Sequence, residues 1–220
     1  MVYKSLERFI SNIMNIIELR QKGILIASNN PHKIIELRQL LEPYSIPVRT
    51  PEELGITLEV FETGKTFEEN AKLKVEAFFN VAKIPTIADD SGLEVDALNK
   101  EPGVYSARYG REDFTDNERN LYLLEQIKNV ADYLRTARFV CVLAFKYESH
   151  SPIRFYQGIA EGKILYQPRG VNGFGYDPIF EDIKTKKSFA ELTLEEKNQI
   201  SHRAKALQLF IKDLMLLMGR

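Results

Sequence analysis

Short apolar runs alternate with longer stretches of helical periodicity along this chain. Apolar runs of about four to eight residues are typical of buried strands, and such runs lie at 23–27, 85–88, 138–145 and 153–160. Apolar residues spaced three and four apart, bounded by capping residues or Pro, predict helices over 31–41, 66–79, 116–128 and 201–218. The last two strand-like runs suggest an antiparallel pair. This alternation predicts an α/β fold, in which a mixed sheet carries helices on both faces.

The first 22 residues carry a separate amphipathic pattern. Its apolar face is formed by Leu6, Phe9, Ile10, Ile13 and Ile17. The segment contains acids and no small-residue cleavage site, so we expect a helix that packs on the body or on a partner subunit rather than a signal peptide. A start at Met14 is the alternative. We therefore expect a helical extension over 1–22 and a single α/β domain over 23–220.

Composition excludes several classes of partner. Hydrophobic residues make up 44% of the chain, which is enough for a substantial core, and 30 basic against 31 acidic residues give a net charge of −1. That balance argues against a nucleic-acid or membrane binder, and no apolar run is long enough to cross a membrane. The single Cys141 cannot form an internal disulfide, so we expect a reducing, cytoplasmic compartment.

Two adjacent carboxylates, Asp89 and Asp90, follow the apolar run at 85–88 and precede Ser91 and Gly92, which read as a turn. Carboxylates at the end of a strand usually open into the crevice where α/β sheets bind ligands. The pair predicts a divalent-metal site that also serves as a base; a solvated turn acid plus a helix cap is the alternative.

Glu62, in a Glu-Thr-Gly loop, can share a cation with Asp90 if the loop folds over the same crevice. Mg²⁺ typically takes one or two protein carboxylates and leaves its other positions to water and phosphates. Lys74 lies in the helix that follows. It lines the cleft only if the helix turns that face toward the cleft. Taken singly, Glu62 reads equally well as a loop residue and Lys74 as a solvated one.

The turn between the first strand and the first helix of the body is a candidate anion cradle. Its residues are Ser28, Asn29, Asn30, Pro31, His32 and Lys33. Free N–H groups at a helix start, together with the helix dipole, favour an anion, and Lys33 can reach a phosphate held there. The glycines of a Walker loop are missing, and an ordinary polar turn is the alternative.

Two further segments are suited to a planar heterocycle. The glycine-rich loop 170–178 offers aromatic surface and an acceptor through Phe174, Gly175, Tyr176 and Asp177; a tight turn with aromatic core residues is the alternative. Near the start of the last helix stand Lys197, His202 and Arg203, where cations suggest an anion or exocyclic oxygens as partners. Each of these three residues, taken singly, also has a structural or surface explanation.

Seven segments in order resemble one known family, the inosine triphosphate pyrophosphatases, also called non-canonical purine NTP pyrophosphatases. They are SNNPHK (28–33), FETGKTFEENA (61–71), IADDSGLEVDAL (87–98), PGVYSARY (102–109), RFVCVLAF (138–145), PRGVNGFGYDPIF (168–180) and AELTLEEKNQISHRAKAL (190–207). The resemblance implies an elongated α/β protein with a cleft between two lobes, generally a homodimer. It also implies Mg²⁺-dependent hydrolysis of ITP, dITP and XTP to the monophosphate and pyrophosphate.

The resemblance assigns roles by motif position. Asp90 matches the proton acceptor and metal ligand, Glu62 its metal partner, and Lys33 a cation that assists catalysis at the phosphates. Substrate-binding positions fall on residues 28–33, Lys74, Ser91, residues 174–177, Lys197, His202 and Arg203. Ser28 replaces a common Thr, Asn99 and Lys100 replace a common Gly-Gly, and residues 1–22 lie outside the usual pattern.

Two other functions stay open from the sequence. A Maf-like pyrophosphatase would share the general architecture and prefer dTTP or UTP. A nucleotide-binding regulator without turnover is the other, although added negative charge at Asp89 and Asp90 does not help a mere binder of polyanions.

Overall fold

A computed structural model describes residue 19 and residues 21–217 of the 220-residue chain. The helix expected over 1–22 lies outside the described residues except for residues 19, 21 and 22. Of these, Leu19 is buried in the core, and its carbonyl accepts a hydrogen bond from the Gly23 N–H. Met218, at the end of the last predicted helix, also lies outside.

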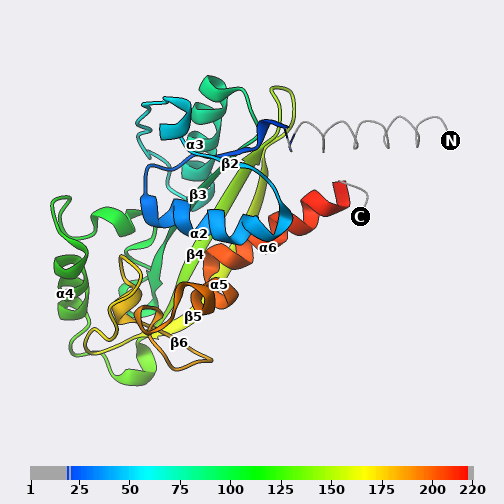
Figure 1. Cartoon of the computed structure of the whole chain (residues 1–220). Coiled ribbons are helices and arrows are strands. Elements are labelled where there is room, and N and C mark those ends of the chain that lie inside the picture. The colour runs from blue at the N-terminus through cyan, green and yellow to red at the C-terminus, as the bar shows by residue number, and fades with distance from the viewer. Residues whose placement is uncertain (1–18, 20, 218–220) are drawn as a thin grey trace, which may run out of the picture.

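Six strands form one mixed sheet in the order β2-β1-β3-β4-β5-β6 (Figure 1). Their bounds are β1 Ile24–Ile26, β2 Val48–Arg49, β3 Thr86–Val95, β4 Thr136–Lys146, β5 Arg154–Ile164 and β6 Phe180–Asp182. Strand β1 pairs in parallel with β2 and β3, whereas β3, β4, β5 and β6 pair antiparallel. The mixed sheet and the antiparallel pair of long strands expected from the sequence are thus confirmed.

Five α-helices are described within residues 21–217: α2 Pro31–Leu41, α3 Phe67–Ala82, α4 Asp116–Gln126, α5 Leu194–Ile200 and α6 His202–Leu217. The capping residues read from the sequence act as expected at several starts. The Thr66 hydroxyl accepts the Glu69 N–H at the start of α3, and the Ser201 hydroxyl accepts the Ala204 N–H at the start of α6. None of these helices combines the length and apolar character that crossing a membrane requires.

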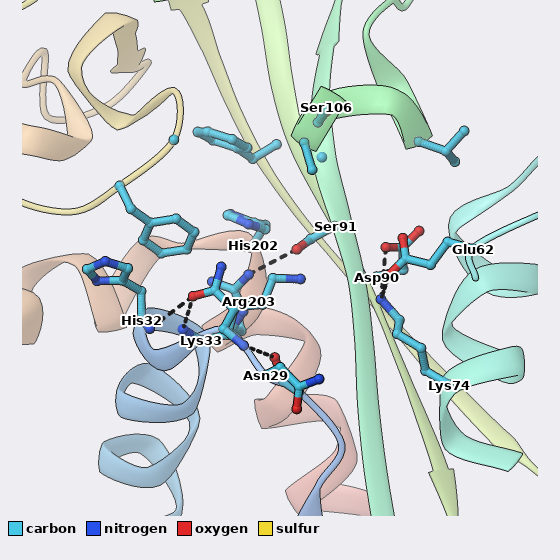
Figure 2. A pocket seen from close by; sticks show the side chains of 18 of the residues that line it. Asn29, His32, Lys33, Glu62, Lys74, Asp90, Ser91, Ser106, His202 and Arg203 are labelled. Carbon is cyan, nitrogen blue, oxygen red and sulfur yellow. Dashed lines mark hydrogen bonds and ion pairs between the residues drawn. The ribbon is translucent and has the colours of Figure 1, made fainter. Parts of the chain in front are cut away.

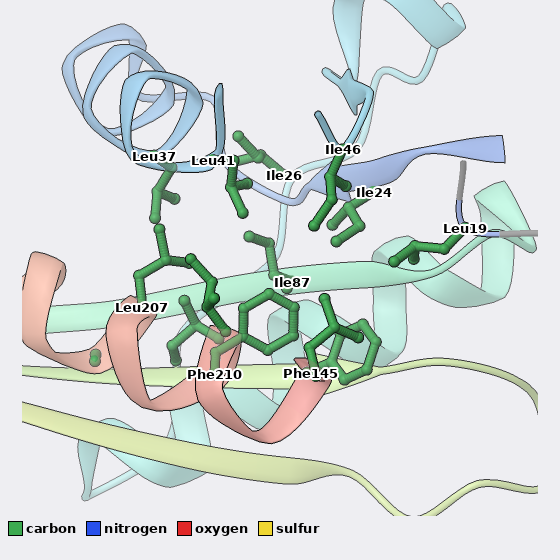
Figure 3. Packing of buried hydrophobic residues seen from close by; sticks show 14 of the residues in the cluster. Leu19, Ile24, Ile26, Leu37, Leu41, Ile46, Ile87, Phe145, Leu207 and Phe210 are labelled. Carbon is green, nitrogen blue, oxygen red and sulfur yellow. The ribbon is translucent and has the colours of Figure 1, made fainter. Parts of the chain in front are cut away.

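The long strands β4 and β5 connect two parts of an elongated molecule (Figure 1). One part carries α2 and α3, and the other carries α4 and β6. In the first part, α2 and α6 cover one face of the sheet, where Leu37 and Leu41 meet Leu207 and Phe210 across Ile87 (Figure 3). Helix α3 covers the opposite face with its own apolar cluster. The expectation of an elongated sheet with helices on both faces is therefore confirmed.

The sequence prediction for residues 89–92 was wrong. Asp89, Asp90, Ser91 and Gly92 do not leave the sheet in a turn; they continue β3 and pair with β4, Asp90 opposite Val142. Gly92 serves close packing instead, because a Cβ at that position would lie 2.3 Å from the carbonyl oxygen of Gly103. Since neighbouring side chains of a strand point to opposite faces, the two carboxylates separate.

Candidate functional site

A cavity of about 440 Å³ lies against the middle of β3 and receives side chains from both parts of the molecule. All of the predicted site residues except Pro31 line it. Figure 2 shows Glu62, Lys74 and Asp90 on one side of β3, and Lys33 and Arg203 on the other. Segments that are up to about 170 residues apart in sequence therefore converge on one site.

The turn that leads into α2 uses its own backbone donors. The Asn30 side chain caps the helix by accepting the N–H groups of His32 and Lys33, at 3.0 and 3.3 Å, and the Asn30 N–H donates to the Ser28 hydroxyl. Pro31 stands at the first helical position and does not line the cavity. The expected cradle of free N–H groups is thus wrong in detail, and positive charge in this turn comes from the Lys33 side chain and the helix dipole.

Asp90 lies in a network that links β3 to α3. Its Oδ1 is 3.1 Å from the Lys74 Nζ, and its Oδ2 accepts the Asn70 amide at 3.1 Å. Asn70 and Lys74 are four residues apart, so both face β3 from the same side of α3. Burial raises the pKa of Asp90; Lys74 opposes the rise and the Glu62 carboxylate adds to it. A carboxylate held in this way is a stronger base than an exposed Asp.

The carboxylates of Glu62 and Asp90 both form ion pairs with the Lys74 ammonium. The Lys74 Nζ lies 2.7 Å from the Glu62 carboxylate and 3.1 Å from that of Asp90. Among the described residues no three His, Cys, Asp or Glu side chains are grouped to hold a metal. Two converging carboxylates without a third therefore fit an ion that brings most of its ligands with it, as Mg²⁺ bound to phosphates does.

Asp89 holds the cations on the other face of β3. Its Oδ2 lies 3.1 Å from the Lys33 Nζ and 3.2 Å from the Arg203 Nη2. Burial alone would raise the pKa of Asp89, but the charges of Lys33 and Arg203 outweigh it and hold the pKa well below its usual range. The Ser91 hydroxyl bridges the group, because it donates to Asp89 and accepts from Arg203.

The loop 170–178 presents Phe174 to the cavity and buries Tyr176. Phe174 stacks on His32, with ring centroids 5.0 Å apart, and the Lys197 Nζ lies 4.9 Å from the Phe174 centroid. Tyr176 is packed in the core of the part that carries α4, and its hydroxyl donates to the Ser106 carbonyl. For Tyr176 the alternative reading, an aromatic core residue, therefore describes its packing better than a stacking surface does.

Asp177 fixes this loop rather than standing free. Its Oδ2 accepts the Phe174 N–H at 2.9 Å and lies 2.5 Å from the Lys197 Nζ. Gly173 has φ +74°, and a Cβ there would lie 2.1 Å from the same carboxylate oxygen. Phe174 is thus placed by a buried carboxylate that approaches the backbone at Gly173.

The predicted cations Lys197 and Arg203 are both buried and share a carboxylate that the sequence reading missed. Glu36 on α2 accepts from the Lys197 Nζ at 2.8 Å and from the Arg203 Nη1. His202 stacks on Phe139, with ring centroids 4.7 Å apart. Burial lowers the pKa of His202 well below its usual range, and Arg203 and Lys197 add to the effect. The imidazole is therefore neutral at pH 7 and can either donate or accept a hydrogen bond.

Several other residues of the site had little signal in the sequence. Glu36 is the single acid of helix α2, and only its position three residues after Lys33 on the same helix face was informative. Asn70 could have been found from its place one turn before Lys74. Asp116, Arg119 and Asn120 lie around the loop at Gly175, which nothing in a polar helix pattern indicates.

Comparison with known proteins identifies this arrangement. Residues 24–213 match the family model described as the Ham1 family. A dITP/XTP pyrophosphatase of Bacillus subtilis is 46% identical over 85% of this chain and 94% of its own length, and one of Thermus thermophilus is 46% identical over 88% and 92%. The structure of a HAM1 protein from Coxiella burnetii, 40% identical, superposes with a TM-score of 0.80 over 88% of this chain and 98% of that one. The Staphylococcus aureus Ham1 protein, 43% identical, gives 0.77 over 89% and 98%. The resemblance read from the seven sequence segments is confirmed.

Proposed function

Because this chain belongs to the Ham1 family, we propose that it is a pyrophosphatase that hydrolyses ITP, dITP and XTP to the monophosphate and pyrophosphate. Relatives that bear the name dITP/XTP pyrophosphatase cover most of the chain at about 45% identity. The observation that carries the proposal is the distribution of charged groups on the two faces of β3. Carboxylates with Lys74 lie on one face, and cations beside an aromatic ring lie on the other.

The chemistry of pyrophosphate release requires a water that attacks the α-phosphorus. Asp90 accepts the proton of that water at its carboxylate, because burial and the nearby Glu62 favour its protonated form more than in an exposed Asp. Lys74 holds both carboxylates within 3.1 Å of its ammonium and keeps Asp90 oriented. Glu62 and Asp90 would hold Mg²⁺, which neutralises the phosphates when it is bound.

Lys33 supplies positive charge to the triphosphate on the other face. Its side chain is about one-sixth exposed and lies against Asp89 at 3.1 Å, at the start of a helix whose dipole also favours an anion. Charge that grows on the leaving pyrophosphate is stabilised by a cation placed in advance. Ser28, Asn29 and Asn30 also line this end of the cavity.

Base selection rests on donors beside Phe174. Lys197 and Arg203 carry only donors, so an oxygen at position 6 of the purine pairs with them and an amino group does not. Neutral His202 lines the same wall. Buried polar groups left without a partner can discriminate by about 10⁴-fold or more, which accounts for rejection of ATP.

The metal, the assembly and the compartment are parts of the same proposal. Mg²⁺ is supported by the two converging carboxylates, the homodimer by the family resemblance, and a reducing cytoplasmic compartment by the single buried Cys141. No nucleic-acid or membrane partner is proposed, because the net charge of −1 offers no general basic surface.

A substrate panel tests the function. Pyrophosphate release is measured from ITP, XTP, GTP, ATP, dTTP and UTP, with Mg²⁺ and with chelator. Fast Mg²⁺-dependent cleavage of ITP and XTP, with slow cleavage of GTP and ATP, is expected. A preference for dTTP or UTP would indicate a Maf-like enzyme, and ITP affinity without hydrolysis would indicate a regulator; either result contradicts the proposal.

A further inference from the structure

Arg119 is a buried cation in the cavity wall that the proposed mechanism does not use. It lies on α4 with 6% of its surface exposed. Within the described part of the chain, its guanidinium donates to the Asp116 Oδ1 at 3.3 Å and to the Phe114 carbonyl at 2.9 Å. Its Nε–H is buried without a partner. A guanidinium has five N–H donors and no acceptor, so this group has donor capacity left for an oxygen.

The residues around Arg119 on α4 hold the loop that carries Phe174. The Gly175 N–H donates to the Asp116 Oδ2 at 2.7 Å, and the Asn120 amide donates to the Gly175 carbonyl at 2.9 Å. The backbone N–H and the carbonyl of Gly175 are thus both bound by α4, through residues that precede and follow Arg119 in the sequence. Arg119 is thereby fixed beside the base-binding loop and on a different element from Lys33, Lys74 and the phosphate end.

Arg119 also differs in location from the cations that face position 6 of the purine. Lys197 and Arg203 come from α5 and α6 and are paired through Glu36. Arg119 comes from α4 and lines the wall with Ser106, Gly175 and Tyr176. Two sets of donors therefore border the base-binding end of the cavity from separate elements.

We propose that Arg119 is a further specificity-determining residue, which donates to an oxygen at position 2 of the purine and disfavours an amino group there. Xanthine carries an oxygen at position 2, and the xanthine ring loses a proton near neutral pH, so that this oxygen bears part of a negative charge. Hypoxanthine carries only hydrogen at position 2, so it neither pairs with Arg119 nor opposes it. Guanine carries an amino group at position 2, which is a donor and faces the Arg119 guanidinium, which has no acceptor. Both groups stay unpaired, and this disfavours the binding of GTP. This inference rests on the proposed function and supplies the discrimination at position 2 that the position-6 donors cannot provide.

The experiment compares kcat/KM for XTP, ITP and GTP in the wild type and in Arg119→Met. ITP is the reference substrate, because it has no substituent at position 2. We expect the XTP/ITP ratio to fall by about tenfold or more, as for loss of a charged hydrogen bond, and the GTP/ITP ratio to rise. Arg111→Met is the matched control, since Arg111 is exposed, is paired with Asp113 and is absent from the cavity wall; its ratios should equal those of the wild type.

A purely structural role gives a different pattern. If Arg119 acts only by holding Asp116 against Gly175, then Arg119→Met and Asp116→Ala lower kcat/KM for all three substrates in parallel, and that result overturns the proposal. Thermal unfolding shows whether the variants are folded. If Arg119→Met is not folded, Arg119→Lys should change the same ratios in the same direction.

Inhibition of the wild type by XMP, IMP and GMP gives a test without any variant. The inhibition should be strongest for XMP and weakest for GMP, and GMP as tight as XMP overturns the proposal. A wild type that cleaves neither ITP nor XTP would instead refute the proposed function, and the wild-type rates alone show this.

Discussion

Glu36→Gln should reduce stability strongly, because this buried carboxylate joins two buried cations. Glu36 is 3% exposed and accepts from Lys197 at 2.8 Å and from the Arg203 guanidinium. Burial alone would raise the pKa of Glu36, but Arg203 and Lys197 outweigh burial and hold the pKa below its ordinary value. The ionised form is therefore the one that stabilises the folded protein.

The magnitude follows from the contacts that are lost and kept. Two hydrogen bonds to charged groups contribute about 1.5–3 kcal/mol each, or about 3–6 kcal/mol together. Each cation keeps another carboxylate, Asp177 for Lys197 and Asp89 for Arg203. We therefore expect the lower end, a loss of about 3 kcal/mol in the free energy of unfolding, which lowers Tm by about 6–12 °C in a protein of this size.

Urea unfolding at several pH values measures this loss, with Glu53→Gln as the matched control. Glu53 also pairs with an Arg of α2, Arg38, at 2.8 Å, but both side chains are exposed, so its loss should be less than about 1 kcal/mol. The difference between wild type and Glu36→Gln should be constant at neutral pH and shrink as the pH falls below about 4.5, because Glu36 is protonated first in the unfolded chain and only at lower pH in the folded protein. A loss below about 1 kcal/mol at pH 7, or a difference that grows in acid, would refute the reasoning.

Three further outcomes test the site. Asp90→Asn should lower kcat by about 10²–10⁴-fold while ITP binding, measured by calorimetry, largely survives; near-wild-type turnover would remove Asp90 from its role as base. Lys197→Met should lower kcat/KM for ITP by about tenfold or more and that for ATP by less, because only ITP offers an oxygen at position 6; equal losses would show that Lys197 does not read the base. Gly173→Ala should raise the KM for ITP, since a Cβ would lie 2.1 Å from the Asp177 carboxylate and φ is +74°; an unchanged KM would mean that the position of Phe174 does not depend on this approach.

The local elements could be predicted where the sequence itself supplies their ends. Pro31 at the first turn of α2 and Thr66 at the cap of α3 are such cases, and the structure places both helices at the expected starts. The expected strand at 85–88 stopped too early. Asp89 and Asp90 are unfavourable in a strand by propensity, and only pairing with β4 and the ion pairs across the sheet keep them there.

The residues that line the cavity could be named from the motifs, but their contacts could not. The polar lining of the cavity at Ser28, Lys33, Lys74 and Arg203 agrees with the motif positions. The two acids face opposite sides of β3, each with its own cations, because the strand continues through both of them, and their spacing alone does not indicate that. Glu36 was missed for a similar reason, because only the packing of α2 on α5 and α6 makes its carboxylate a buried one.

A competition between ITP and GTP in ¹⁸O-labelled water, with Mg²⁺, tests the central claim most directly. One mass spectrum of the products reports which base is chosen and which phosphorus is attacked. The account predicts that IMP forms well before GMP, that the label is in IMP, and that unlabelled pyrophosphate is released with it. Equal rates for the two nucleotides, or label in pyrophosphate or in free phosphate, would contradict it.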